Sequence, residues 1–86
     1  MPIALEILTK KDCCLCDEAK IIVDRVLKDY SAQLTVTDIE SDNDLFELYK
    51  ERIPVLKIND EEHFVFKVHE ITLRKKLDKI LQENRP

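Results

Sequence analysis

The sequence predicts an α/β fold in which three helices cover one mixed, four-stranded sheet. Apolar stretches with the short repeat of strands alternate with stretches that have the three- and four-residue repeat of helices, in the order β-α-β-α-β-β-α. A right-handed crossover makes the first two strands parallel, and a short turn makes the last two antiparallel. No linker or internal repeat divides the chain, so we expect residues 1–86 to form a single domain.

The first half of the chain contains two predicted strands and one long helix. Residues 3–8 form a nearly continuous apolar run, which is typical of a buried parallel strand. Residues 14–29 carry apolar side chains at three- and four-residue steps, which predicts an amphipathic helix. Leu34 and Val36 alternate with polar residues in a second strand that ends near Ile39.

The second half continues with a short helix, a hairpin and a final helix. Residues 41–44 supply an N-cap and an acidic first turn for the short helix. Turn residues 59–62 separate a strand at 55–58 from the last strand, and the final helix spans 70–83. The apolar residues expected to face inward are Leu45, Leu48 and Tyr49 in the short helix, Phe64, Phe66 and Val68 in the last strand, and Leu73, Leu77, Ile80 and Leu81 in the final helix.

Composition excludes several classes of function. The net charge of −4, from 18 acidic and 14 basic residues, argues against a nucleic-acid surface. The chain has no glycine, which excludes a glycine-rich phosphate loop. It shows neither a signal peptide nor an apolar run of the roughly 18 residues that cross a membrane. We expect a cytoplasmic monomer that has neither nucleic acid nor membrane as a partner.

All three cysteines lie in the stretch TKKDCCLC, at the junction between the first strand and the first helix. Cys13 and Cys16 are three residues apart, so they face each other across one helical turn at a separation that a disulfide can bridge. Unpaired N–H groups at a helix start stabilise a thiolate, so we expect Cys13 to be the more acidic and accessible thiol. Cys14 is adjacent to Cys13 and poorly placed for either pairing. Two interpretations of it stay open: a bystander, or a residue that tunes the redox cycle.

These residues resemble a known family. Residues 9–16, together with Ile53-Pro54-Val55, are similar to the glutaredoxins of the thioredoxin superfamily, and most similar to a small group with a C-x-L-C motif followed by Asp-Glu-Ala. The resemblance covers residues 3–82. It implies a thioredoxin-like (glutaredoxin-type) fold and a thiol-disulfide oxidoreductase that reduces protein or small-molecule disulfides.

The resemblance also implies roles for individual residues. Cys13 would attack the substrate, and Cys16 would resolve the mixed disulfide and leave a redox-active Cys13–Cys16 bond. Pro54 would be a cis-proline facing the cysteines, the Ile53 backbone would pair with an extended substrate, and Lys10 would help to hold a glutathione carboxylate. Glutaredoxins have a glycine turn after the last strand, whereas this chain has Lys-Val-His-Glu at 67–70. We therefore expect no tightly bound cofactor, glutathione as a weak co-substrate, and thioredoxin or glutathione as the reductant.

A second class of function is a non-catalytic module that binds a metal, an iron–sulfur cluster or a partner protein. A zinc site would need His63 and His69 besides the cysteines, and these histidines are about fifty residues away in the sequence. We expect solvated or hydrogen-bonded histidines and no metal. Arg52 has two interpretations, a guide for acidic substrates or an ordinary surface charge.

Overall fold

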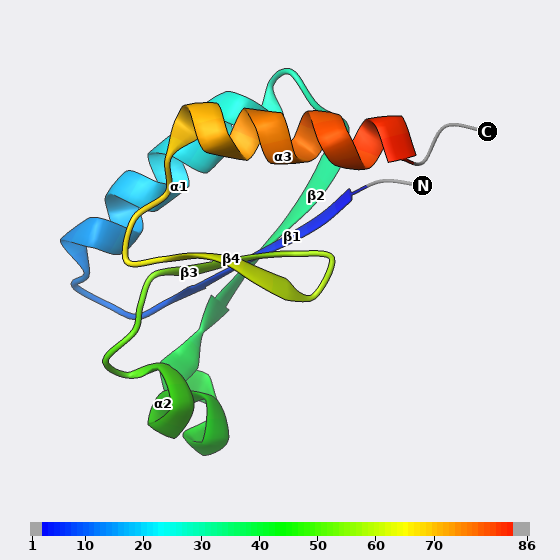
Figure 1. The fold of residues 1–86 in the computed structure, drawn as a ribbon. Helices are drawn as coiled ribbons and strands as arrows, with labels where there is room; N and C mark the ends of the chain where they lie inside the picture. Colours follow the sequence, from blue (N-terminus) through cyan, green and yellow to red (C-terminus); the bar gives the residue numbers. More distant parts are fainter. Residues whose placement is uncertain (1–2, 84–86) are drawn as a thin grey trace.

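The computed structural model describes residues 3–83 and has the predicted elements in the predicted order (Figure 1). The four strands form one sheet in the order β2-β1-β3-β4. Strand β1 runs parallel to β2 and antiparallel to β3, and β3 is antiparallel to β4, so the predicted mixed sheet is confirmed. The elements are β1 (Ile3–Thr9), α1 (Cys14–Leu27), β2 (Ala32–Asp38), a short 3-10 helix (Ile39–Ser41), α2 (Asn43–Tyr49), β3 (Val55–Ile58), β4 (Glu61–Val65) and α3 (Glu70–Glu83).

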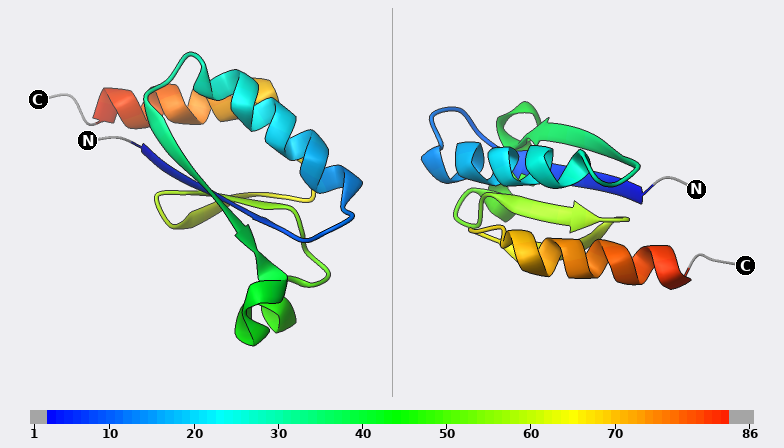
Figure 2. Two further views of the ribbon diagram at one scale, coloured as in Figure 1. Left: turned by 180° about the vertical axis from the view of Figure 1, so that it is seen from behind. Right: turned by 90° about the horizontal axis from the view of Figure 1, so that it is seen from above.

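The helices lie on the two sides of the sheet. Helices α1 and α3 are together on one side, and α2 is on the other (Figures 1 and 2). Successive residues of a strand point to opposite faces, so Ile3, Leu5 and Ile7 contribute to the core beneath α1 and α3, whereas Leu8 faces the side of α2. None of the helices among residues 3–83 is long and apolar enough to cross a membrane.

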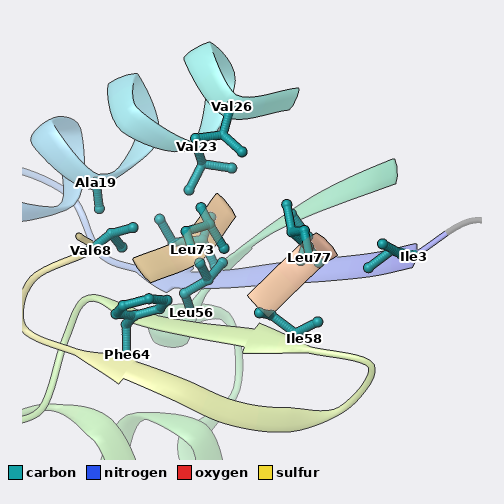
Figure 3. Packing of buried hydrophobic residues seen from close by; sticks show 12 residues of the cluster. Ile3, Ala19, Val23, Val26, Leu56, Ile58, Phe64, Val68, Leu73 and Leu77 are labelled. Carbon is teal, nitrogen blue, oxygen red and sulfur yellow. The ribbon is translucent and has the colours of Figure 1, made fainter. Parts of the chain in front are cut away.

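Two apolar clusters hold the layers together. The larger cluster joins the sheet to α1 and α3 (Figure 3). It stabilises the fold mainly because its apolar side chains are removed from water. The smaller joins the end of β1 and the start of β3 to α2 and to the first turn of α1. The larger cluster consists of Ile3, Leu5, Ile7, Ala19, Val23, Val26, Leu56, Ile58, Phe64, Val68, Leu73 and Leu77; the smaller consists of Leu8, Cys16, Ile39, Tyr49, Ile53 and Val55.

Two helical residues that were expected to face inward are exposed instead. Leu48 is 66% exposed because Tyr49, the next residue of this two-turn helix, occupies the inward position. Leu81 is 39% exposed, whereas the neighbouring Ile80 packs against the core, since adjacent helical residues differ in direction by about 100°.

The hairpin also differs from the prediction. Its turn is shorter than 59–62 and consists of Asn59 and Asp60, both with left-handed backbones (φ 51° and 69°), as the type I′ hairpin turn requires. The predicted alternation of the last strand through Phe66 is wrong, because β4 ends at Val65 and Phe66 turns away with φ 71°. Val68 is buried as expected, but it lies outside the strand.

Candidate active site

Three loops gather at one end of the sheet. Strand β1 ends where β3 begins, because Leu8 pairs with Val55, and β4 ends beside the same residue through the pair Val55–Val65. The loop from β1 to α1, the loop entering β3 and the loop from β4 to α3 therefore lie together (Figures 1 and 2). This arrangement brings the cysteines near the Ile53-Pro54 segment although about forty residues separate them in the sequence.

Cys13 is the N-cap residue of α1 and is partly exposed. Its Sγ accepts a hydrogen bond from the backbone N–H of Cys16 at 3.2 Å, and its carbonyl accepts one from the N–H of Asp17 at 3.1 Å. The left-handed backbone of Asp12 (φ 57°) makes the abrupt turn from the strand into the helix. The sulfur thus lies at the positive end of the helix dipole, where an N–H donor stabilises a negative charge on it.

Cys16 has a different environment one turn further along α1. Only 1% of it is exposed, and it packs in the smaller cluster with Ile53 and Val55. Burial, followed by the hydrogen bond to the Cys13 side chain, raises the pKa of the Cys16 thiol from 9.0 to about 11, although the backbone of Lys10 acts in the opposite direction. Cys16 is therefore a neutral thiol at physiological pH.

The remaining residues of the motif are solvent-facing. Cys14 is exposed, and Leu15 is 48% exposed in the first turn of α1. Lys10 lies in the loop from β1 to α1 with an exposed side chain. The structure brings Cys13, Cys16 and Ile53 into one cluster. The catalytic and substrate-binding roles of these residues, like those of Cys14 and Lys10, stay predictions.

The Ile53-Pro54 segment borders the cysteines. The Ile53–Pro54 peptide bond is cis, and the carbonyl of Pro54 accepts a hydrogen bond from the N–H of Phe66 at 2.8 Å. Among residues 3–83, no backbone group hydrogen-bonds to the N–H or C=O of Ile53. These two polar groups are available to an extended chain that approaches Cys13.

A polar cluster supports the loop that enters β3. The hydroxyl of Tyr49 donates to Glu62 Oε1 at 2.8 Å, and Arg52 Nη2 donates to the same oxygen at 3.1 Å. The Arg52 guanidinium also lies 5.1 Å from the centre of the Tyr49 ring. The Arg52 guanidinium is therefore already paired with a carboxylate of the protein itself. The hydrogen bond to Glu62 raises the pKa of Tyr49.

The loop from β4 to α3 borders a shallow hollow that includes Val68 and His69. Glu70, at the start of α3, is paired with Arg25 at 2.9 Å and with Arg74 at 3.2 Å, and Arg74 also reaches Asp29 at 2.7 Å. The hydrogen bond from Arg25 is the main reason that the pKa of Glu70 is lowered. Both guanidinium groups thus already have carboxylate partners.

The two histidines do not approach the cysteine motif as a ligand set. His63 Nε2 lies 3.7 Å from a carboxylate oxygen of Glu61, and the His69 ring centre is 6.3 Å from that of Phe64. Within residues 3–83, no three His, Cys, Asp or Glu side chains form a group suited to a metal ion.

Comparison with solved structures shows the fold. Ne2328 from Nitrosomonas europaea is 25% identical with a TM-score of 0.77, and the match covers 90% of this chain and 93% of that protein. XcR50 from X. campestris is 25% identical with a TM-score of 0.72 and coverages of 87% and 96%. Thioredoxin 1 from Thermosipho africanus is 14% identical with a TM-score of 0.70 and coverages of 95% and 99%. Among curated proteins, no sequence matches the chain.

The expected fold class is confirmed by these structures, since the element order, the strand order and the similarity to thioredoxin agree. The glutaredoxin-like domain model (DUF836) matches residues 4–78, which include the cysteine motif, the Ile53-Pro54 segment and most of α3. The chain has a thioredoxin-like fold and belongs to the family of glutaredoxin-like domains.

Proposed function

We propose that the protein is a thiol-disulfide oxidoreductase that works through a Cys13/Cys16 dithiol. The observation that carries the proposal is the contrast between the two sulfurs. Cys13 is partly exposed, with an N–H donor 3.2 Å from its Sγ, whereas Cys16 is buried one turn away with a raised pKa. An accessible sulfur with a backbone N–H donor beside it suits attack, and a buried thiol suits the later intramolecular step.

The reaction requires only the two cysteines and a substrate disulfide. The Cys13 thiolate attacks one substrate sulfur, the substrate S–S bond breaks, and the other substrate sulfur leaves as a thiolate that can take the proton of Cys16. Cys16 then attacks Cys13 Sγ and releases the second substrate sulfur, which is protonated from solvent. Two electrons pass to the substrate, and the enzyme is left with a Cys13–Cys16 disulfide.

The Ile53 backbone is the proposed docking point for substrate. Its N–H and C=O have no backbone partner among the described residues, and its side chain packs in the cluster that contains Cys16. A strand-like segment of an oxidised protein can pair with these groups as in β-augmentation. Protein disulfides are the proposed substrates, and small disulfides that reach Cys13 react as well.

A dithiol protein such as a thioredoxin is the proposed reductant, with glutathione as a weak co-substrate. Arg25 and Arg74 are already paired with carboxylates, so neither is free to hold a glutathione carboxylate at the start of α3. The side chains of Val68 and His69 occupy the segment where glutaredoxins have a glycine turn. An odd number of closely spaced cysteines favours a reducing compartment, and we infer a cytoplasmic location.

Mass spectrometry and trapping test the proposal. Mild oxidation should remove two hydrogens from the wild type and from Cys14→Ser, but not from Cys13→Ala. Cys16→Ser should hold substrates as mixed disulfides on Cys13, because the resolving thiol is missing. Bound zinc or the colour of an iron–sulfur cluster, without a redox-active disulfide, would support the non-catalytic alternative.

A second experiment identifies the reductant. The rate at which the oxidised protein is reduced is measured with glutathione and with a thioredoxin system at matched potential, and the faster reaction distinguishes the two.

A further inference from the structure

Phe66 has a backbone conformation that its residue type disfavours. Its φ is 71°, in the left-handed region, where the Cβ atom crowds the backbone. The other described residues with positive φ are Asp12, Asn59 and Asp60, which belong to the two non-glycine types that tolerate this region best. A large aromatic residue at this position therefore destabilises the folded protein unless another interaction compensates.

Packing within the protein does not explain the aromatic ring. Phe66 is 50% exposed, whereas Phe64, two residues earlier, is 7% exposed and belongs to the core. The hydrogen bond that Phe66 donates to the Pro54 carbonyl comes from its backbone N–H, which every residue except proline possesses. The fold thus uses the backbone of Phe66 and leaves half of the residue in water.

The position of Phe66 is directly beside the proposed substrate site. Its N–H is 2.8 Å from the carbonyl of Pro54, the residue that follows Ile53. Leu15, between the second and third cysteines, is 48% exposed in the first turn of α1, which directly follows the loop from β1. An extended chain that pairs with Ile53 would bring its own side chains close to this apolar surface.

We propose that Phe66 is a specificity-determining residue that packs against an apolar side chain next to the reactive cysteine of an extended protein substrate. The inference rests on the proposed oxidoreductase function and names its preferred substrate class: polypeptide disulfides with apolar neighbours, in preference to small polar disulfides. Strain and exposure at one residue are typical of sites where local stability is given up for function. The contact with substrate covers the ring and compensates for the strain.

The test compares two disulfides and four proteins. Insulin serves as the polypeptide disulfide and bis(hydroxyethyl) disulfide as the small one, both with dithiothreitol as the reductant. The proteins are the wild type, Phe66→Asn, Phe66→Leu and the control Leu81→Ser. Asparagine tolerates the left-handed backbone and lacks the ring, whereas leucine keeps an apolar side chain. Leu81 is 39% exposed on α3, whose C-terminal end lies away from the three loops (Figure 1).

Phe66→Asn should raise KM for insulin about tenfold, the effect of losing one well-packed aromatic contact. It should change kcat/KM for the small disulfide by less than about twofold, because no new barrier arises at Cys13. Its urea midpoint should be equal to or higher than that of the wild type. Phe66→Leu should recover most of the affinity for insulin, and Leu81→Ser should behave like the wild type with both disulfides.

Four results would overturn the inference. An unchanged KM for insulin in Phe66→Asn would show that the ring does not contact the substrate. An equal loss with both disulfides would show that Phe66 acts on the cysteines instead, and a lower urea midpoint would show that the fold needs the ring. A wild type that reduces neither disulfide, although it is folded, would remove the proposed function and this inference with it.

Discussion

Cys16 should react with alkylating reagents only at strongly alkaline pH. The residue is 1% exposed, and its pKa is raised from 9.0 to about 11, first by burial and second by the hydrogen bond to Cys13. Alkylation requires the thiolate, so both the low exposure and the raised pKa slow the reaction. Cys13, which is partly exposed, does not share this burial.

The size of the effect follows from the shift in pKa. At pH 9.0 an ordinary thiol is half ionised, whereas a thiol with a pKa of about 11 is roughly 1% ionised. Cys16 should therefore be alkylated about fifty times more slowly than an ordinary thiol at this pH, before its low exposure slows it further. The midpoint of its labelling curve should lie near pH 11.

Labelling with iodoacetamide across the alkaline range, followed by peptide mass spectrometry, measures both cysteines in one sample. A Cys14→Ser background removes the third thiol without touching either sulfur of interest. Cys13→Ala should lower the Cys16 midpoint to a value between 9.0 and about 11, because the contribution of Cys13 is lost while burial remains. A midpoint at or below 9.0 in the Cys14→Ser protein, or labelling of Cys16 before Cys13, would refute the assignment of roles.

The same shift makes stability depend on pH. A thiol whose folded pKa is raised contributes stability that is fully present below the unfolded value of 9.0 and is lost as the pH rises through about 11. The urea concentration at the unfolding midpoint should therefore decrease as the pH is raised from 9.0 to about 11. Cys16→Ala should reduce this fall, because it removes the titrating group.

Three further predictions concern packing and surface charge. Leu77→Ala should lower the free energy of unfolding by about 2 to 5 kcal/mol, since Leu77 is fully buried. Leu48→Ala should change it by less than about 0.5 kcal/mol, because Leu48 is exposed. Urea denaturation measures both variants, and equal losses would contradict the observed orientation of α2. Arg74→Ala should destabilise the protein slightly, and the difference should shrink with added salt, because salt screens its partly exposed ion pairs. Urea denaturation at two salt concentrations measures this, and a difference that salt does not change would exclude this reason. Ultraviolet titration should give midpoints above 10.0 for both tyrosines, and Glu62→Ala should bring that of Tyr49 down, because the phenol donates to the carboxylate that this variant removes.

Most of the fold could be predicted because the chain has strong local patterns. The two-residue repeat and the helical repeat identify the elements, and the right-handed crossover decides the direction of the first two strands. The errors arise where adjacent apolar residues fit the helical repeat equally well, so that the repeat does not decide which one faces the core. Leu48 and Tyr49 are adjacent apolar residues in a helix of two turns, and only the packing of α2 on the smaller cluster decides which one is buried.

The cysteine pair could be located from the sequence because its geometry is local. A spacing of three residues at a helix start fixes the relation of Cys13 to Cys16 with no knowledge of the rest of the chain. The approach of Ile53 is not local, since it depends on the pairing of β1 with β3, and the sequence offered only the family resemblance for it. The ion pairs of Glu70 depend on how α1 packs against α3, so spacing could not reveal them.

Phe66 shows the limit most clearly. The sequence marks the Asn59-Asp60 turn with residue types that favour a left-handed backbone, and the structure has that backbone there. At Phe66 the residue type favours an extended strand, so alternation with Phe64 predicts a buried ring, and the structure has a half-exposed ring on a turning backbone. Local preference and fold disagree at this residue, and such disagreement in a natural protein is concentrated where function opposes stability. Its position beside Pro54 therefore makes Phe66 the residue to test first for recognition of protein substrates.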